Sequence, residues 1–491
     1  MAPPDLLHRI DAAVGDALEG AVHAHHRRRL GRLGHSSALD PPRTAALWAG
    51  GVAAGPRSGN AIDVLIDGEE AFEAIDEAIR GARSHVHVAA WHVDPEFVLR
   101  RSGPHAGVEL RELLAEASRR AQVRVLQWAG APLPVFDPTR KSVREGRRRL
   151  LDVDGTAVRC ALDTKERPMH CHHEKLVIVD DEVAFVNGID MTALAGDRLD
   201  EQTHPARGRL GWHDAGLRIR GPLVADVARH FAARWRDVDG EELPEPATPE
   251  PAGTVEAQLV RTVPERVYEF LPRGEFSILE SYLRALRSAE RLVYLENQFL
   301  WSPEACGLLA EKLERPPRDD FRVVVLLPER ANNGQDDTRG QLGILAEADD
   351  RGGGGRFLAC TLRSRSGERS ERLYVHAKIG IVDDRWLTVG SANVNAHSFF
   401  NDSEVNVVTC DESLARDTRL RLWAEHLERS RSEVDGEPSR VVDELWRPIA
   451  HEQKERAARG EPLTHHLLQL PGVSKRAARL RGPLDALVVD G

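Results

Sequence analysis

The chain has 491 residues, of which 41% are hydrophobic and 30% are charged, and its formal net charge is −11. This length predicts more than one compact unit, because single hydrophobic cores stop growing at about 250–300 residues. The negative charge argues against non-specific binding to nucleic acid, which depends on a cationic surface. The sequence also lacks a run of about 20 apolar residues that would predict a membrane-spanning helix.

Cysteine usage and the first residues point to a cellular compartment. The five scattered cysteines do not have the pattern of a disulfide framework. The N-terminus shows no cationic and apolar signal segment. We therefore expect a cytoplasmic, reduced protein that can also make peripheral contact with a membrane surface.

Residues 1–60 are expected to form a helical arm followed by a connector. The arm, residues 5–33, ends in the basic run His25-His26-Arg27-Arg28-Arg29. We interpret this run as a solvated helix end, with attraction to anionic lipid headgroups as the alternative. Residues 34–60 are rich in glycine, proline and serine, as is typical of a connector.

From residue 61 to residue 243, short apolar strands alternate with helices. Strands are expected at 62–66, 86–91 and 123–128, and helices near 69–82 and 107–120. Such alternation predicts an α/β unit with a parallel or mixed β-sheet flanked by helices.

A proline-rich linker, residues 244–253, precedes a second unit with the same order of elements, residues 254–435. Val86 lies 87 residues before His173 (173 − 86), and Leu292 lies 84 before His376 (376 − 292). Such matching offsets predict a duplicated α/β domain whose two copies face each other around one central site. Residues 436–491 are expected to form a tail packed on the core.

Each copy carries one His-x-Lys-x4-Asp motif. The motif residues are His173, Lys175 and Asp180 in the first copy, and His376, Lys378 and Asp383 in the second. Because residues i and i+2 of a strand point to the same side, each His and Lys should project together into one pocket. Each Asp lies at the far end of its strand, so we expect it to organise a turn or pair with a neighbour. Only seven of the 67 basic residues are lysines and 67 − 7 = 60 are arginines, so two lysines at equivalent positions indicate a specific role.

Six residues after each motif, the sequence predicts a turn of small residues. The turns are Asn187-Gly188-Ile189-Asp190 and Gly390-Ser391-Ala392-Asn393. Small residues let the backbone approach a bound anion, and an asparagine amide can donate to a phosphate oxygen. We therefore expect Asn187, Asp190, Ser391 and Asn393 to bind substrate.

A catalytic imidazole needs an orienting carboxylate on its other ring nitrogen. Asp214 and Glu404 each follow a motif and precede a strand and a long helix. We expect Asp214 to orient His173 and Glu404 to orient His376, with an ordinary surface acid as the alternative for each.

Aromatic residues and two loops are expected around the cleft. Trp91, Trp128, Trp212 and Phe299 line or support it, although core packing explains them equally well. Loops 192–211 and 329–340 should form the rim.

The run His170-Cys171-His172-His173 raises the alternative of a metal site. Adjacent side chains on an extended segment point apart, so we favour a packing role for His172 and expect no metal and no cofactor. A redox pair of Cys160 and Cys171 is a weaker alternative.

The two motifs, with the Gly-Ser-x-Asn turn after the second, resemble the phospholipase D superfamily. Segments 294–299, 212–214 and 420–427, and the tail from Trp446 to Gly491, are similar to plant and animal phospholipases D. The resemblance covers residues 60 to 491. Asn187 departs from the glycine common at that turn in the family.

This resemblance implies two phospholipase D-like domains packed about a pseudo-two-fold axis. It further implies attack by His173 on the distal phosphodiester of a glycerophospholipid, with His376 as acid and base and the two lysines stabilising the developing charge. Trp91 and Asn297 are expected beside the substrate. Both motifs lie in one chain, so a monomer suffices. A cardiolipin synthase-like phosphatidyltransferase, a nuclease and an inactive lipid-binding protein are the alternatives.

Overall fold

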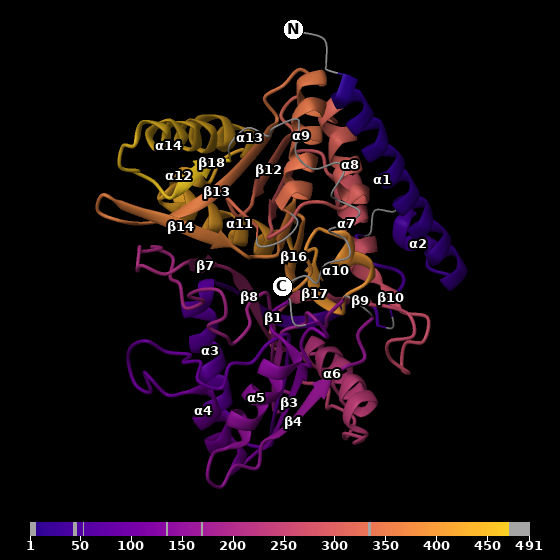
Figure 1. The fold of residues 1–491 in the computed structure, drawn as a ribbon, viewed down its shortest axis with the longest axis vertical. Coiled ribbons are helices and arrows are strands. Elements are labelled where there is room, and N and C mark those ends of the chain that lie inside the picture. The colour runs from indigo at the N-terminus through magenta and orange to yellow at the C-terminus, as the bar shows by residue number, and fades with distance from the viewer. Residues whose placement is uncertain are drawn as a thin grey trace.

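The computed structural model describes residues 6–42, 47–52, 54–133, 136–167, 170–331 and 335–470. Figure 1 shows two lobes, with the first half of the chain in indigo to magenta and the second half in coral to yellow. Helix α1 (Leu6–Leu33) lies along the flank of the second lobe.

A seven-stranded mixed sheet forms the first half. Its strands, in spatial order, are β1 (Arg57–Ile66), β8 (Ala215–Arg220), β6 (Val183–Asn187), β5 (Leu176–Val179), β2 (His85–Ala90), β3 (Gln122–Trp128) and β4 (Arg159–Asp163). Strands β2, β3 and β4 run parallel, and the other pairs are antiparallel.

The second half repeats this order. Its strands are β9 (Val255–Val263), β17 (Glu404–Thr409), β16 (Trp386–Gly390), β15 (Ile379–Val382), β11 (Leu292–Glu296), β12 (Arg322–Leu326) and β13 (Phe357–Ser366). Every strand thus has a counterpart in the first half, with the same parallel and antiparallel pairs, and the predicted duplicated α/β fold is confirmed. Strand β18 (Leu467–Gln469) adds to the far edge beside β13.

Two pairings join the halves. Strand β1 pairs with β8 through residues 61–66 and with β9 at Arg57 and Asn60, so it belongs to both sheets. The short strand β7 (Gly211–His213) of the first half runs parallel to β14 (Arg369–Val375) of the second. Because β1 begins at Arg57, the connector is shorter than the expected 34–60.

Helices cover the outer faces of the sheets because their apolar residues recur every three to four positions, as in Ala71, Phe72, Ile75 and Ile79 of α3. The first half contains α3 (Asp67–Gly81), α4 (Leu110–Ser118), α5 (Arg140–Leu151) and α6 (Leu223–Asp239). The second contains α7 (Ser277–Ser288), α8 (Pro303–Glu314), α9 (Gln335–Arg351), α10 (Ala396–Phe400) and α11 (Glu412–Leu427). Shorter elements are α2 (Ser36–Leu39), β10 (Glu275–Phe276), α12 (Arg431–Val434), α13 (Pro438–Val441) and a π-helix (Val442–Trp446), followed by α14 (Arg447–Arg459).

The inner faces of the two sheets share one hydrophobic core. Ile178 and Leu217 of the first sheet lie in the same buried cluster as Ile379 and Val407 of the second. The central strands are buried on both faces, which explains their uninterrupted apolar runs. This shared core fixes one half against the other, so the ends of β5 and β15 hold a defined relative position.

The end of the N-terminal arm is packed rather than solvated, contrary to our interpretation. Arg29 is 4% exposed and forms an ion pair of 2.5 Å with Glu265. The His26 ring stacks on Phe400 with 3.8 Å between centroids. The other three residues of the run, His25, Arg27 and Arg28, remain exposed. The basic run is therefore divided between an interior face and a solvent face of one helix.

Parts of the expected rim and tail lie outside the residues that the structure describes. The rim residues Asn332, Asn333 and Gly334 and the tail from residue 471 lie outside the described residues. Between Gly240 and Thr254 the described chain forms neither helix nor strand, at the place of the expected linker. Among the described helices, none is long and apolar enough to span a membrane.

Candidate active site

The two motif histidines occupy equivalent places in the duplicated fold. His173 lies two residues before Lys175 and three before β5, and His376 stands in the same relation to Lys378 and β15. Both imidazoles are buried. Burial, followed by the charges of Lys378, Arg198, Lys175 and His173, holds the pKa of His376 well below its ordinary value. Since these charges come from both halves, the two motifs lie close to each other.

Each histidine is oriented by a carboxylate from the opposite half. Nδ1 of His376 lies 2.5 Å from Oδ2 of Asp214, and Nδ1 of His173 lies 3.1 Å from Oε1 of Glu404. The sequence-based assignment paired each carboxylate with the histidine of its own half, and that assignment is wrong. Asp214 and Glu404 do serve as orienting groups, but across the seam.

The backbone explains this exchange. The N–H of His173 donates to the carbonyl of Ser403 at 2.9 Å, and the N–H of His376 donates to the carbonyl of His213 at 2.8 Å. Ser403 and His213 are the residues immediately before Glu404 and Asp214. The start of each motif therefore lies beside the segment that carries the carboxylate of the other half. The same arrangement occurs in both halves.

The two carboxyl groups are buried and supported by hydrogen bonds. The hydroxyls of Ser391 and Ser398 donate to Glu404 at 2.5 and 2.6 Å, and the Ala215 N–H donates to Asp214 at 2.8 Å. Burial raises the pKa of Glu404 to about 8 and that of Asp214 to about 6, and the nearby Lys175 and Lys378 respectively oppose these shifts. A carboxylate bound at Nδ1 directs the Nε2 atom of each imidazole away from it, which leaves Nε2 for chemistry.

The two lysines are held against their own histidines. Lys175 donates to the carbonyl of His173 at 2.7 Å and forms an ion pair of 3.2 Å with Asp190. Lys378 donates to the carbonyl of His376 and lies 3.5 Å from Oε1 of Gln298. Both ammonium groups are buried. Two buried ammonium groups beside the histidines can attract an anionic ligand.

The turn residues mostly support the site rather than line it. Ser391, expected to bind substrate, instead donates its hydroxyl proton to Glu404. Asn187 pairs with Gly216 on the neighbouring strand. A Cβ atom on residue 216 would lie 2.0 Å from the Asn187 side-chain oxygen, so only glycine fits there. The second half reverses this pair, with Gly390 opposite Asn406. Each half thus pairs one asparagine with one glycine, and the two halves place the asparagine on opposite strands of the pair. This explains why Asn187 stands where the family commonly has glycine.

Three further polar residues hold the surrounding loops. Asp190 accepts the Trp91 N–H at 3.1 Å in addition to its ion pair with Lys175. Asn297 accepts the Val394 N–H at 3.1 Å. Asn393, the counterpart of Asp190, directs its side-chain amide toward Gln298 at 3.4 Å. Asn393 and Gln298 thus stand beside Lys378, where they can contact a ligand.

The two motif aspartates lie away from the pocket and organise turns, as expected. Asp180 accepts the backbone N–H groups of Ser84 at 2.7 Å and His85 at 2.8 Å. Asp383 accepts those of Arg291 and Leu292, both at 2.8 Å. Each motif aspartate therefore anchors the start of the strand antiparallel to its own, which is β2 beside β5 and β11 beside β15.

Aromatic rings flank the histidines. The edge of Trp91 faces His173 with 6.3 Å between centroids, and Trp212 lies 4.6 Å from His376. Trp128 stacks on Trp91, and Phe299 belongs to the hydrophobic core of the second half. The expectation that tryptophans support the cleft therefore holds for Trp91, Trp128 and Trp212, whereas Phe299 is a core residue.

Arg198, in the expected rim loop, is a site residue that the sequence analysis missed. Its guanidinium carbon lies 3.7 Å from the centroid of Trp212, and the residue is only 4% exposed. Its Nε and Nη1 atoms have no hydrogen-bond partner within the described part of the chain. The sequence analysis could not identify Arg198, because it lies in a loop expected at the surface and only the tertiary fold buries it.

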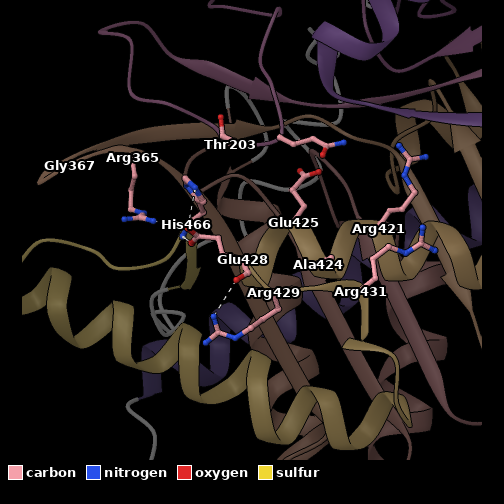
Figure 2. Close-up of a pocket in the computed structure, with 11 residues that line it drawn as sticks. Thr203, Arg365, Gly367, Arg421, Ala424, Glu425, Glu428, Arg429, Arg431 and His466 are labelled. Carbon is pink, nitrogen blue, oxygen red and sulfur yellow. Dashed lines mark hydrogen bonds and ion pairs between the residues drawn. The ribbon is translucent and has the colours of Figure 1, made fainter. Parts of the chain in front are cut away.

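Behind the catalytic strand lies a separate polar network. His213, between Trp212 and Asp214, points away from His376 and bonds Asp67 and Glu296, each at 2.8 Å. Glu425 connects this network to a groove of about 790 Å³. Figure 2 shows the arginines of this groove, where Arg365 is paired with Glu428 at 2.6 Å. The groove contains no motif residue and is distinct from the catalytic pocket.

Three groups within the described ranges bring together metal-ligand atoms. They are Asp67, His204, His213 and Glu425; His213, Glu296 and His426; and His170, His397 and Asp402. The first two are linked by carboxylate–imidazole hydrogen bonds. His172 is a packing residue whose Nδ1 hydrogen-bonds the Ser403 hydroxyl at 3.1 Å and whose Nε2 lies 3.1 Å from Oδ1 of Asp163. Cys160 and Cys171 are not joined by a disulfide.

Known proteins share this sequence pattern and fold. A family profile described as "Cardiolipin synthase, PLD-like domain" matches residues 283–424. Phospholipase D A of Dictyostelium discoideum is 25% identical over 458 residues, covering 74% of this chain and 35% of that protein. Phospholipase D alpha 1 of Carica papaya is 26% identical over 583 residues, covering 82% of this chain and 70% of the plant protein. The chain thus spans about a third of the slime-mould relative.

Among solved structures, phosphatidylserine synthase of Haemophilus influenzae Rd KW20 has the same fold. The TM-score is 0.51 at 14% identity, covering 81% of this chain and 93% of the synthase. Two histidine–carboxylate pairs cross between the halves, with two buried lysines beside them. The chain belongs to the phospholipase D superfamily.

Proposed function

We propose that this protein is a phosphodiesterase, specifically a phospholipase D that hydrolyses the distal phosphodiester bond of glycerophospholipids. The observation that carries the proposal is the convergence of two oriented imidazoles and two buried ammonium groups on one pocket. The similarity to phospholipases D from organisms as different as Dictyostelium discoideum and Carica papaya supports the lipid substrate.

The reaction has two displacements at phosphorus. Nε2 of His173 attacks, a bond forms between nitrogen and phosphorus, and the bond from phosphorus to the headgroup oxygen breaks. His376 gives its Nε2 proton to that oxygen, which releases the alcohol. His376 then removes a proton from water, and the hydroxide attacks phosphorus while the bond to His173 breaks. An alcohol in place of water gives headgroup transfer.

The surrounding cations serve this sequence of steps. Lys175 and Lys378 stabilise the charge on the non-bridging oxygens, and Arg198 provides a third positive charge from the rim loop. Before substrate binds, these charges lower the pKa of His376. A bound phosphodiester anion counters them, so substrate binding favours the protonated His376 that the first step requires.

A phosphatidyltransferase resembling cardiolipin synthase is the second candidate. The matched family profile for residues 283–424 carries that description, which favours it. A nuclease of the same superfamily is a weaker candidate because the chain has a net charge of −11. In all three cases both half-sites lie in one chain, so we expect a monomer to be active, with peripheral contact to a membrane.

One assay separates these candidates. Purified protein is incubated with phosphatidylcholine and ethanol in the presence of EDTA, and the lipid products are resolved by chromatography. Release of choline with formation of phosphatidylethanol is the expected result. Conversion of phosphatidylglycerol to cardiolipin would favour the synthase, and salt-sensitive cleavage of DNA would favour the nuclease. Inactivity toward every phospholipid tested would refute the proposal.

A further inference from the structure

Beside His173, at the seam between the halves, three side chains direct donor atoms toward a common point. His170 precedes β5, His397 lies in α10 and Asp402 lies just before β17. The Nδ1 atoms of His170 and His397 are 3.2 Å apart, and Nδ1 of His170 is 3.5 Å from Oδ1 of Asp402. One donor atom from each residue lies within 4.8 Å of the other two.

The surroundings leave part of this cluster without partners. Asp402 is fully buried and His397 is 2% exposed. Oδ2 of Asp402 and Nε2 of His397 have no hydrogen-bond partner in the part of the chain that the structure describes. Oδ1 of Asp402 also accepts the Cys171 N–H at 2.9 Å, which fixes the carboxylate in place. The His170 side chain keeps 14% exposure, which gives solvent access to the cluster.

We propose that His170, His397 and Asp402 form a site for a divalent transition-metal ion of the zinc type. Zn²⁺ prefers imidazole nitrogen and carboxylate oxygen at about 2.0–2.2 Å, which places tetrahedral ligand atoms about 3.3 Å apart. The observed separations of 3.2 and 3.5 Å match that spacing. Two Nδ1 atoms facing each other satisfy both lone pairs through one cation, whereas a direct hydrogen bond requires a proton on one ring. Three protein ligands leave a fourth position open.

The location gives the ion a positioning role. His170 lies three residues before His173, and Asp402 lies two residues before Glu404. The Ser403 N–H donates to the carbonyl of Cys171 at 3.2 Å between these two segments. An ion bound here would therefore join the two backbone segments that carry the His173–Glu404 pair. It would strengthen the seam without touching the phosphorus atom.

The alternative to a metal site is a pair of histidines that share one proton beside Asp402. Metal-binding measurements distinguish these two possibilities. Full-length protein stripped with a chelator is titrated with Zn²⁺ by calorimetry. Co²⁺ is used as a second probe because its visible absorption reports nitrogen and oxygen ligands. We expect wild type to bind one more equivalent than His170→Ala, or to bind that equivalent more than about 10-fold more tightly. Zn²⁺ should raise the Tm of wild type but not that of His170→Ala.

His451→Ala is the matched control, since His451 is exposed on α14 far along the chain. It should bind Zn²⁺ as wild type does. His397→Gln is the second variant, in case His170→Ala is affected by its loop position, and it should lose the same equivalent. Wild-type binding retained by both His170→Ala and His397→Gln, or no binding by wild type, would overturn the proposal. The readout is metal binding, so its failure leaves the phospholipase D proposal untouched.

Discussion

Nδ1 of His376 lies 2.5 Å from Oδ2 of Asp214, a residue 162 positions earlier in the chain and in the other half of the fold. The reciprocal pair, His173 and Glu404, is separated by 231 positions. Neither half by itself pairs its motif histidine with an orienting carboxylate. The duplication therefore produces one candidate site rather than two, and its histidine–carboxylate pairs form at the seam between the halves.

Loss of either imidazole should abolish turnover, but a good leaving group should separate their roles. His173→Ala and His376→Ala are each expected to lower kcat by at least about 10²–10⁴. A substrate that releases p-nitrophenol needs little protonation of its leaving group, so His376→Ala should release a rapid first equivalent of p-nitrophenol and His173→Ala should release none. Comparing initial rates on both substrates checks this, with His451→Ala as the control. Equal release by both variants would contradict the assignment of nucleophile and acid.

The crossed pairing can be tested with the same substrates. Because Asp214 orients His376, Asp214→Asn should lose about 10²–10⁴ in kcat on a phospholipid but release a rapid first equivalent of p-nitrophenol. Glu404→Gln, acting on His173, should not release it rapidly. Asp63→Asn alters a partly exposed acid of β1 and should be neutral. The opposite pattern of release would mean that each carboxylate serves the histidine of its own half.

Arg198→Met should weaken catalysis and shift its pH dependence. We expect kcat/KM to fall by about 10–100-fold, since a charged hydrogen bond to an anion is worth about 1.5–3 kcal/mol. The charge of Arg198 lowers the pKa of His376, so its removal should move the corresponding limb of the pH–rate profile to higher pH. Arg209→Met changes an exposed arginine in the same loop and should leave both quantities unchanged. An unshifted profile with normal kcat/KM would exclude Arg198 from the site.

Stability should depend on pH through Glu404. Burial raises the pKa of this carboxyl from 4.5 to about 8, so the folded state holds the proton more tightly than the unfolded state does. Stability from this group is present below about pH 4.5 and is lost as the pH rises toward 8. The Tm of Glu404→Gln relative to wild type should therefore rise between pH 5 and pH 8. The exposed Glu452→Gln should show no such trend, and a constant difference for Glu404→Gln would contradict the shifted pKa.

The N-terminal arm should contribute to the stability of the second half. Arg29→Met leaves Glu265 without its closest cation and removes the hydrogen bond to the Phe400 carbonyl at 2.9 Å. We expect a loss of about 2–3 kcal/mol in the free energy of unfolding, below the value for a fully buried pair because Glu265 keeps 15% exposure. Urea unfolding of this variant and of Arg28→Met, an exposed neighbour, measures the difference. Equal midpoints would show that the arm is not docked.

The sequence alone predicted the duplicated fold and named the groups that we propose to react. Strand and helix periodicity is local, and the repeated offsets to His173 and His376 relate the halves without any knowledge of their packing. Lys175 and Lys378 could be assigned to the pocket because residues i and i+2 of a strand share a side. Asp180 and Asp383 could be excluded from it for the same reason, since they lie at the other strand end.

Only the tertiary structure decided which carboxylate meets which histidine. Both pairings are compatible with the same chain order, and the choice depends on how the two sheets pack across their shared core. Burial of Arg198 over Trp212, docking of Arg29 on Glu265 and convergence of His170 with His397 and Asp402 have the same origin. Each is a contact between segments distant in sequence, and periodicity and spacing carry no information about such contacts.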